Sequence, residues 1–260
     1  MRIKIHLENI KNDYIKIPIE YNEIVQAFIY DNLNVDTAEL IHNSGFLYQK
    51  RKFKLFTFSR ILSYSQPEKD KKYFLFKNRI SIVVCSLIDK MIQELALNLI
   101  KKENVKLGQQ ELKIHSIEVE KNNQISGKTK IKTLSPITIY STVKINNSKK
   151  TYFYSPSEKE FSNLIIQNLI RKYKSYPQTN ISTENLSTEN LNQEETGGNY
   201  YIKPIKYKEN IVKYKNTVIK AYHGIFEVFL PEHLYFVALN AGMGNKNSQG
   251  FGCIKIIHAN

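Results

Sequence analysis

The chain has 260 residues, 42% hydrophobic and 24% charged, which is a globular composition with enough length for one large domain or two smaller ones. The 38 lysines and arginines against 24 aspartates and glutamates give a formal net charge of +14, which indicates a polyanionic partner, either nucleic acid or an anionic membrane surface. The composition excludes a disordered chain, and the longest apolar stretches, residues 80–87 and 225–230, are too short for the roughly 20 residues of a membrane-spanning helix.

The N-terminal residues MRIKIHLEN predict a strand with two different faces. Ile3, Ile5 and Leu7 point one way, whereas Arg2, Lys4, His6 and Glu8 point the other way and make one face basic. The same alternation lacks the continuous apolar run of a secretory signal, so we expect a cytoplasmic protein.

The first half of the chain predicts a ferredoxin-like domain, over residues 1–126. Apolar residues at 3.6-residue spacing predict its helices, and alternating apolar segments predict its strands. In chain order we expect the N-terminal strand, helices at 21–33 and 36–43 (the second with Asp36 or Thr37 as N-cap), strands at 54–59 and 73–85, a helix at 87–101 and a strand at 112–119. The order β-α-β-β-α-β places two helices on one face of an antiparallel sheet and leaves the other face free.

The second half, residues 127–260, repeats this order less regularly. We expect a strand at 134–143, a helix at 157–172 with Phe161, Leu164, Ile165 and Leu169 inward, strands at 200–207 and 211–230, a short helix after Pro231 and a strand at 251–257. The fold class is therefore α+β with tandem ferredoxin-like domains. The acidic segment at 182–199, which contains STENL twice, is expected to be a mobile loop.

Two cysteines offer no sign of a metal site. Cys85 and Cys253 lie in apolar surroundings with no Cys or His at metal-ligand spacing. We expect two buried thiols in a reducing compartment, with no zinc site and no disulfide.

The motif GMGNKNSQGFG contains four glycines, Gly242, Gly244, Gly250 and Gly252. Glycines this dense permit positive φ and let backbone N–H groups approach phosphates closely. The segment lacks the G-K-[ST] of a P-loop and runs from helix to strand, so it does not fit a nucleotide-binding fingerprint. A simple turn before the last strand remains an alternative.

A second group of chemically active residues lies near the N-terminus. Tyr30 ends the first expected helix, His42 ends the second, and Lys54 follows in GFLYQKRKFKLFTFS. Cleavage within RNA needs a base for the ribose 2′-hydroxyl, an acid for the leaving 5′-oxygen and a cation for the charged phosphorane. Tyrosine, histidine and lysine can supply these without a metal ion, although a solvated surface histidine remains an alternative for His42.

Four segments together resemble the CRISPR-associated repeat-processing endoribonucleases of the RAMP superfamily. They are IPIEYNEIVQAFIYDNL, the histidine followed by KLFTFS, TLSPI at 133–137, and GMGNKNSQGFG, so the resemblance covers nearly the whole chain. It implies two ferredoxin-like domains and metal-independent cleavage of CRISPR repeat RNA, the precursor of crRNA, that leaves a 2′,3′-cyclic phosphate. No cofactor is implied.

The resemblance also implies roles for particular residues. Tyr30, His42 and Lys54 match the catalytic set, but the segment after His42 is longer than usual, so Lys50 or Lys52 remains an alternative to Lys54. The acid and base roles stay open. RNA-binding residues are expected at Lys50, Arg51, Lys52, Gly242, Gly244, Lys246, Asn247, Ser248, Gly250 and Gly252.

A different function is a non-catalytic protein of the same fold that holds crRNA in an effector complex. The presence of Tyr30 and His42 together argues for the enzyme. As partners we expect RNA and CRISPR effector subunits, with no membrane. The chain is expected to be a monomer or a homodimer.

Overall fold

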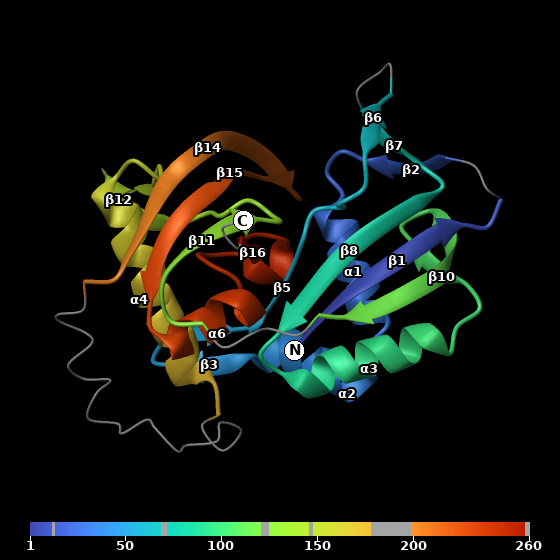
Figure 1. Cartoon of the computed structure of the whole chain (residues 1–260), viewed down its shortest axis with the longest axis horizontal. Coiled ribbons are helices and arrows are strands. Elements are labelled where there is room, and N and C mark those ends of the chain that lie inside the picture. Colours follow the sequence, from blue (N-terminus) through green and yellow to red (C-terminus); the bar gives the residue numbers. More distant parts are fainter. Residues whose placement is uncertain (12–13, 69–71, 121–124, 146–147, 178–198, 258–260) are drawn as a thin grey trace.

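The structure, a computed structural model, describes residues 1–11, 14–68, 72–120, 125–145, 148–177 and 199–257. It consists of two α+β halves that lie side by side, each with helices packed on an antiparallel sheet (Figure 1). The STENL segment lies outside the described residues. Among the described helices, none is both long and apolar enough to cross a membrane.

The first half is built on a five-stranded sheet of order β5-β8-β1-β10-β9. Without the edge strand β9, this is the ferredoxin-like order, since the first and third strands of the βαββαβ unit are central. Its elements are β1 (Arg2–Asn9), α1 (Asn22–Asp31), β5 (Phe56–Phe58), β8 (Arg79–Ser86), α3 (Asp89–Ile100), β9 (Val105–Leu107) and β10 (Gln110–Val119).

The core of this half lies between the sheet and its two helices. Ile3, Ile5 and Leu7 of β1 are fully buried there, as the alternation predicts, and they share one cluster with Met91 and Leu95 of α3. The period-2 pattern of the strand and the 3.6-residue pattern of the helix thus meet on one face.

The second half repeats the arrangement with a four-stranded sheet of order β14-β15-β11-β16. The predicted tandem ferredoxin-like fold is therefore confirmed. Its elements are β11 (Gly127–Thr133), α4 (Lys159–Ser175), β14 (Tyr201–Tyr214), β15 (Thr217–Leu230), α6 (Glu232–Ala241) and β16 (Ile254–Ile257). The boundary at 126/127 stays a prediction, and residues 121–124 beside it lie outside the described residues.

Smaller elements decorate the two halves. A three-stranded sheet and two hairpins extend from them. These elements are β2 (Tyr14–Pro18), β6 (Ser65–Pro67), β7 (Tyr73–Lys77), β3 (Phe46–Tyr48), β4 (Arg51–Phe53), β12 (Tyr140–Ile145), β13 (Ser148–Phe153), α2 (Val35–Glu39), a π-helical turn (Leu40–Ser44) and a 3₁₀ turn (Asn247–Gln249).

Several predicted boundaries are wrong. The predicted strand 73–85 is two strands, because Asn78 has a φ of +54° and breaks it. The cap of α2 is Asn34, in place of Asp36 or Thr37. The predicted break near residue 209 is absent, and β14 runs on to a turn at 215–216.

The predicted strand at 134–143 is also wrong. The first strand of the second half is β11, and residues 135–139 form a buried connection. The backbone groups of residues 134–139 form hydrogen bonds with other segments. For example, the Leu134 N–H donates to the Cys253 carbonyl at 2.7 Å. Apolar residues in this segment therefore reflect burial and do not mark a strand.

The expected free, basic sheet face is wrong in part. Arg2 is 3% exposed and donates to the Ile254 carbonyl in the second half at 2.7 Å, so this end of the face lies in the junction between halves. Further along β1, Lys4 pairs with Glu118, which offsets the charge of Lys4, and Nε2 of His6 lies 3.1 Å from the same carboxylate. The face is therefore neither free nor strongly basic.

Both cysteines are buried free thiols, as expected, and they lie together in the junction. The sulfur atoms of Cys85 and Cys253 are 4.0 Å apart. The junction thus joins β8 of the first half to the segment that leads into β16.

Candidate active site and glycine-rich loop

Tyr30 lies near the C-terminal end of α1, with its ring edge against Phe56 at a centroid distance of 5.8 Å. Burial, and to a lesser extent the neighbouring Tyr214, raises the pKa of its phenol. The side chain therefore remains a neutral O–H group that can donate a hydrogen bond.

His42 lies in the π-helical turn that follows α2, and its side chain is exposed. Its ring is 5.4 Å from the ring of Tyr30, at an interplanar angle of 80°. Nδ1 lies 2.8 Å from the side-chain oxygen of Asn43. When that nitrogen carries a proton, the bond leaves Nε2 available to accept or give a proton on the solvent side.

Lys54 lies between β4 and β5 and is partly buried. Its Nζ donates to the Tyr30 hydroxyl at 3.4 Å, and burial lowers its pKa. Lys52 donates to the Asn43 carbonyl at 3.3 Å, whereas Lys50 lies at the turn of the β3–β4 hairpin. The structure therefore brings Tyr30, His42 and Lys54 together, with Lys52 close by, while their catalytic assignment stays a prediction.

The glycine-rich loop, residues 242–252, connects α6 to β16. All four of its glycines have a φ between +72° and +84°, as the sequence predicts, and Lys246 also has a positive φ of +57°. A residue other than glycine would strain the backbone at these positions.

Close packing against the protein's own backbone explains the glycines. A Cβ at Gly244 would overlap the Thr138 carbonyl oxygen, and one at Gly252 would overlap that of Met243. The N–H groups of Gly242, Gly250 and Gly252 donate to carbonyls within the protein. These three N–H groups therefore already have partners within the protein, and the RNA-binding role of the glycines stays a prediction.

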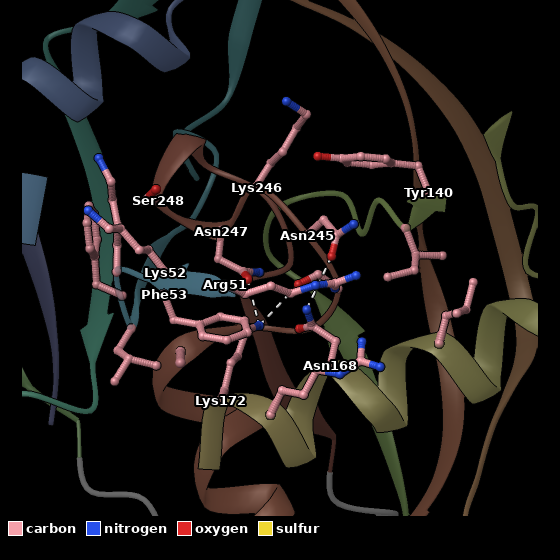
Figure 2. A pocket seen from close by; sticks show the side chains of 18 of the residues that line it. Arg51, Lys52, Phe53, Tyr140, Asn168, Lys172, Asn245, Lys246, Asn247 and Ser248 are labelled. Atoms are coloured by element: carbon pink, nitrogen blue, oxygen red, sulfur yellow. Dashed lines mark hydrogen bonds between the residues drawn. The ribbon is translucent and has the colours of Figure 1, made fainter. Parts of the chain in front are cut away.

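In the centre of the loop, Asn245, Lys246 and Ser248 are partly exposed. The described hydrogen bonds use none of the backbone N–H groups of Lys246, Asn247 and Ser248. The side chain of Lys246 extends into the cleft, whereas that of Asn247 is 8% exposed and turned inward (Figure 2). Lys246 and Ser248 are thus the predicted loop residues that can reach a ligand with their side chains.

The loop also holds the two halves together. Gln26 and Asn22 of α1 donate to the carbonyls of Ser248, at 2.5 Å, and Gln249, at 2.7 Å. Thr57 of β5 donates to the Phe251 carbonyl at 2.9 Å. Since α1 also carries Tyr30, one helix positions both the loop and the candidate catalytic tyrosine.

A cleft of about 700 Å³ lies between the β3–β4 hairpin, helix α4 and the loop (Figure 2). Basic side chains and the aromatic rings of Phe53 and Tyr140 line it; the basic residues are Arg51, Lys52, Lys54, Arg171, Lys172 and Lys246. Within the described part of the chain, its lining contains no aspartate or glutamate. The cleft therefore suits a polyanion whose bases stack on rings.

A smaller recess of about 370 Å³ contains Tyr30 and His42. Lys54 links the two hollows, because it lines the cleft and contacts Tyr30. The recess also contains Glu23 and Glu39, so it lacks the purely basic character of the cleft.

Sequence reasoning missed Tyr140, Arg171 and Lys172. Lys172 had a detectable signal, because it continues the apolar stripe of Phe161, Ile165 and Leu169 on α4 as a charged residue. Arg171 and Tyr140 had none, because basic and aromatic residues are common along this chain.

No cluster of three or more His, Cys, Asp or Glu side chains that could hold a metal ion occurs among the described residues. This finding concerns only side chains that could bind a metal ion. Metal-independent cleavage stays a prediction.

Comparisons with known proteins agree on one family. Residues 118–256 match the family model described as "CRISPR associated protein Cas6, C-terminal". The chain is 25% identical over 248 residues to the CRISPR-associated endoribonuclease Cas6 of Pyrococcus furiosus, covering 95% of this chain and 86% of that one. It is 23% identical to the CRISPR-associated endoribonuclease Cas6 1 of Methanocaldococcus jannaschii, covering 98% and 92%.

Solved structures share the fold over the full length. A Cas6-related protein from Pyrococcus furiosus superposes with a TM-score of 0.80 at 20% identity, covering 100% of this chain and 99% of that one. A protein described as "An RAMP protein binding different RNA substrates" gives a TM-score of 0.77 at 21% identity, with coverage of 99% and 100%.

Proposed function

This chain belongs to the Cas6 family of CRISPR-associated proteins, and we propose that it is an endoribonuclease that cuts CRISPR repeat RNA and so matures crRNA. The observation that carries the proposal is the contact of Tyr30 with both His42 and Lys54, together with the place of Lys54 in the lining of a basic cleft. The relatives named as endoribonucleases support it.

The reaction is an attack of a ribose 2′-oxygen on the adjacent phosphorus. The new O2′–P bond forms, the P–O5′ bond breaks, and the products are a 2′,3′-cyclic phosphate and a free 5′-hydroxyl. A base takes the 2′-hydroxyl proton and an acid gives one to the leaving oxygen. No water, metal ion or oxidant enters this balance.

Three residues supply one of the two proton-transfer groups, a hydrogen-bond donor and a cation. His42 exchanges a proton with the RNA, since its ring is exposed at the recess. Tyr30 stays neutral and donates a hydrogen bond that orients the reacting group, because burial raises its pKa. Lys54 stabilises the negative charge of the phosphorane.

Single-stranded RNA would run through the cleft toward this site. Phosphates would meet the basic side chains, and bases would stack on Phe53 and Tyr140. The competing function is a chain of this fold that binds RNA without cutting it. A relative from Pyrococcus horikoshii, 23% identical, is named a putative CRISPR-associated endoribonuclease-like protein Cas6nc. RNA as the partner follows from the proposal; effector subunits and oligomeric state stay predictions.

The test is incubation of the protein with labelled repeat RNA from the same genome, with and without EDTA. Cleavage at one position should survive EDTA, leave a 2′,3′-cyclic phosphate, and stop when the attacking 2′-hydroxyl is replaced by hydrogen. His42→Ala should lower the cleavage rate on the order of 100- to 10,000-fold with little change in affinity.

His115→Ala is the matched control, because His115 lies on β10 and pairs with Glu8 away from the cleft. Tight binding without any cleavage would establish the competing function. Loss of activity in EDTA that Mg²⁺ restores would contradict the metal-independent mechanism.

A further inference from the structure

Lys172 is a basic residue of the cleft lining whose side chain hydrogen-bonds to the glycine-rich loop. It is 3% exposed, on α4. Its Nζ donates to the Gly242 carbonyl at 2.7 Å, the Gly244 carbonyl at 3.1 Å and the side-chain oxygen of Asn247 at 2.6 Å (Figure 2).

The three acceptors match the three N–H groups of a protonated lysine. A neutral amine has two N–H groups and would leave one acceptor without its bond. Asn247 extends the network, since its amide donates to the carbonyls of Met243 and Phe251, both at 3.0 Å. One ammonium group and one amide therefore tie together the two arms of the loop.

This arrangement is costly for a residue that only fills space. The three acceptors satisfy the N–H groups of Lys172 but carry no full negative charge. A buried charge needs compensation, and the charged side chains that line the cleft with Lys172 are all basic: Arg51, Lys52, Lys54, Arg171 and Lys246. Burial lowers the pKa of Lys172 to about 7. An apolar residue would continue the stripe of Phe161, Ile165 and Leu169 at less cost, so the charge points to a ligand that brings negative charge.

We propose that Lys172 is a positioning residue for RNA binding: it fixes the loop so that Lys246 reaches a phosphate. The negative charge of the bound RNA in turn balances the positive charge of Lys172. The proposal rests on the RNA-binding part of the proposed function. It assigns Lys172 no direct contact with RNA, because its ammonium group is buried and already donates to three acceptors of the loop.

The first measurement follows the loop in the free protein. Lys172→Met removes the charge at similar size, and Lys159→Met is the matched control, an exposed lysine on the same helix. Hydrogen exchange of peptides that cover residues 238–253 should be faster in Lys172→Met by on the order of tenfold, and unchanged in Lys159→Met. Unchanged exchange in a folded Lys172→Met would overturn the proposal.

The second measurement is a double-mutant cycle on RNA affinity, with repeat RNA made uncleavable by a 2′-deoxy substitution. Lys172→Met and Lys246→Ala should each weaken binding on the order of tenfold, and the double variant should bind about as weakly as Lys172→Met alone. Losses that multiply would show that Lys172 acts independently of Lys246 and would overturn the proposal.

Two further controls keep the outcomes distinct. If Lys172→Met does not fold, Lys172→Gln, which keeps a donor, takes its place, and failure of both to fold would assign Lys172 to folding alone. If wild-type protein binds the RNA but never cuts it, the proposed nuclease fails while the cycle still tests Lys172. If wild type does not bind the RNA, both proposals fail.

Discussion

Lys54 and Lys52 both carry a charge near His42, but they have different surroundings. Lys54 is partly buried and contacts the Tyr30 hydroxyl, whereas Lys52 is exposed and contacts the Asn43 carbonyl. A charge in a less hydrated place stabilises a transition state more strongly. Lys54→Met should therefore lower the single-turnover cleavage rate by about 100-fold.

Lys52→Met is the matched comparison for this prediction. Lys52→Met should lower the RNA affinity and make that affinity less dependent on salt. The cleavage rate at saturating protein should stay near that of wild type. The reverse pattern would transfer the catalytic role to Lys52, which the sequence left open.

His223 gives the protein a defined sensitivity to acid. Burial, assisted by the positive charges of Arg60 and Lys132, lowers its pKa to about 4. Between the ordinary histidine pKa of about 6.5 and this value, the unfolded chain binds a proton that the folded chain does not. Folding stability should therefore fall as the pH drops through this window, by up to about 1.4 kcal/mol per pH unit.

The check is urea unfolding at several values between pH 7 and pH 4. His223→Asn should be less sensitive to acid than wild type, and His115→Asn, at an exposed ion-paired position, should behave as wild type. Equal acid sensitivity of His223→Asn and wild type would mean that other groups cause the loss.

At the scale of elements, the sequence predicts the order of helices and strands better than their limits. Periodicity identifies α1, α3 and α4, because each buries one stripe of apolar residues. It fails at residues 134–139, where burial comes from tertiary contacts with residues as distant as Cys253. A local pattern contains no record of such contacts.

The candidate site shows the same limit. Tyr30, His42 and Lys54 could be selected from the sequence through a family resemblance, but the underside of the glycine-rich loop could not. The nearest loop partner of Lys172 along the chain, Gly242, is 70 positions away. Only the folded chain brings them together.

The glycine-rich loop offers a prediction that separates close packing from φ alone. Gly244 and Gly127 have a φ of +72° and +80°, but a Cβ at Gly244 would overlap the Thr138 carbonyl, whereas one at Gly127 would lie 4.0 Å from the Phe229 ring. Both alanine variants should lose about 1 kcal/mol of stability through strain, and Gly244→Ala should lose more.

RNA affinity should distinguish these variants further. Gly244→Ala should bind repeat RNA more weakly and Gly127→Ala should bind as wild type, because the first displaces the segment that carries Lys246. Since backbone contacts do not depend on base identity, the loss should be similar for unrelated RNA sequences. A sequence-dependent loss would indicate that the loop reads bases.

At the scale of the whole molecule, the junction between the halves fixes the cleft. The halves meet through the glycine-rich loop on α1, through the two cysteines, and through Arg2. Figure 1 shows the N-terminus at this junction, where the terminal ammonium group donates to the side chain of Asn240 at 3.2 Å. Catalytic residues on one half and loop residues on the other depend on this contact for their relative position.

Arg2 provides a direct test of that dependence. Its guanidinium pairs with Glu120 at 2.5 Å and donates to the Ile254 carbonyl of the second half at 2.7 Å. Arg2→Met would leave this buried carbonyl without its donor, and Glu120, being partly exposed, would be hydrated in part. We therefore expect a loss of about 2 kcal/mol in the free energy of unfolding.

The matched control for Arg2 is Arg79, which lies in the same sheet and pairs with Glu8 at 3.4 Å while its side chain is 54% exposed. Arg79→Met should change the free energy of unfolding by less than about 0.5 kcal/mol. Because the junction positions the loop against α1, Arg2→Met should also slow cleavage, measured where the variant is fully folded and its concentration saturates the RNA. Arg79→Met should not slow cleavage under the same conditions. Normal cleavage by a destabilised but folded Arg2→Met would mean that the glycine-rich loop alone sets the relative position of the halves.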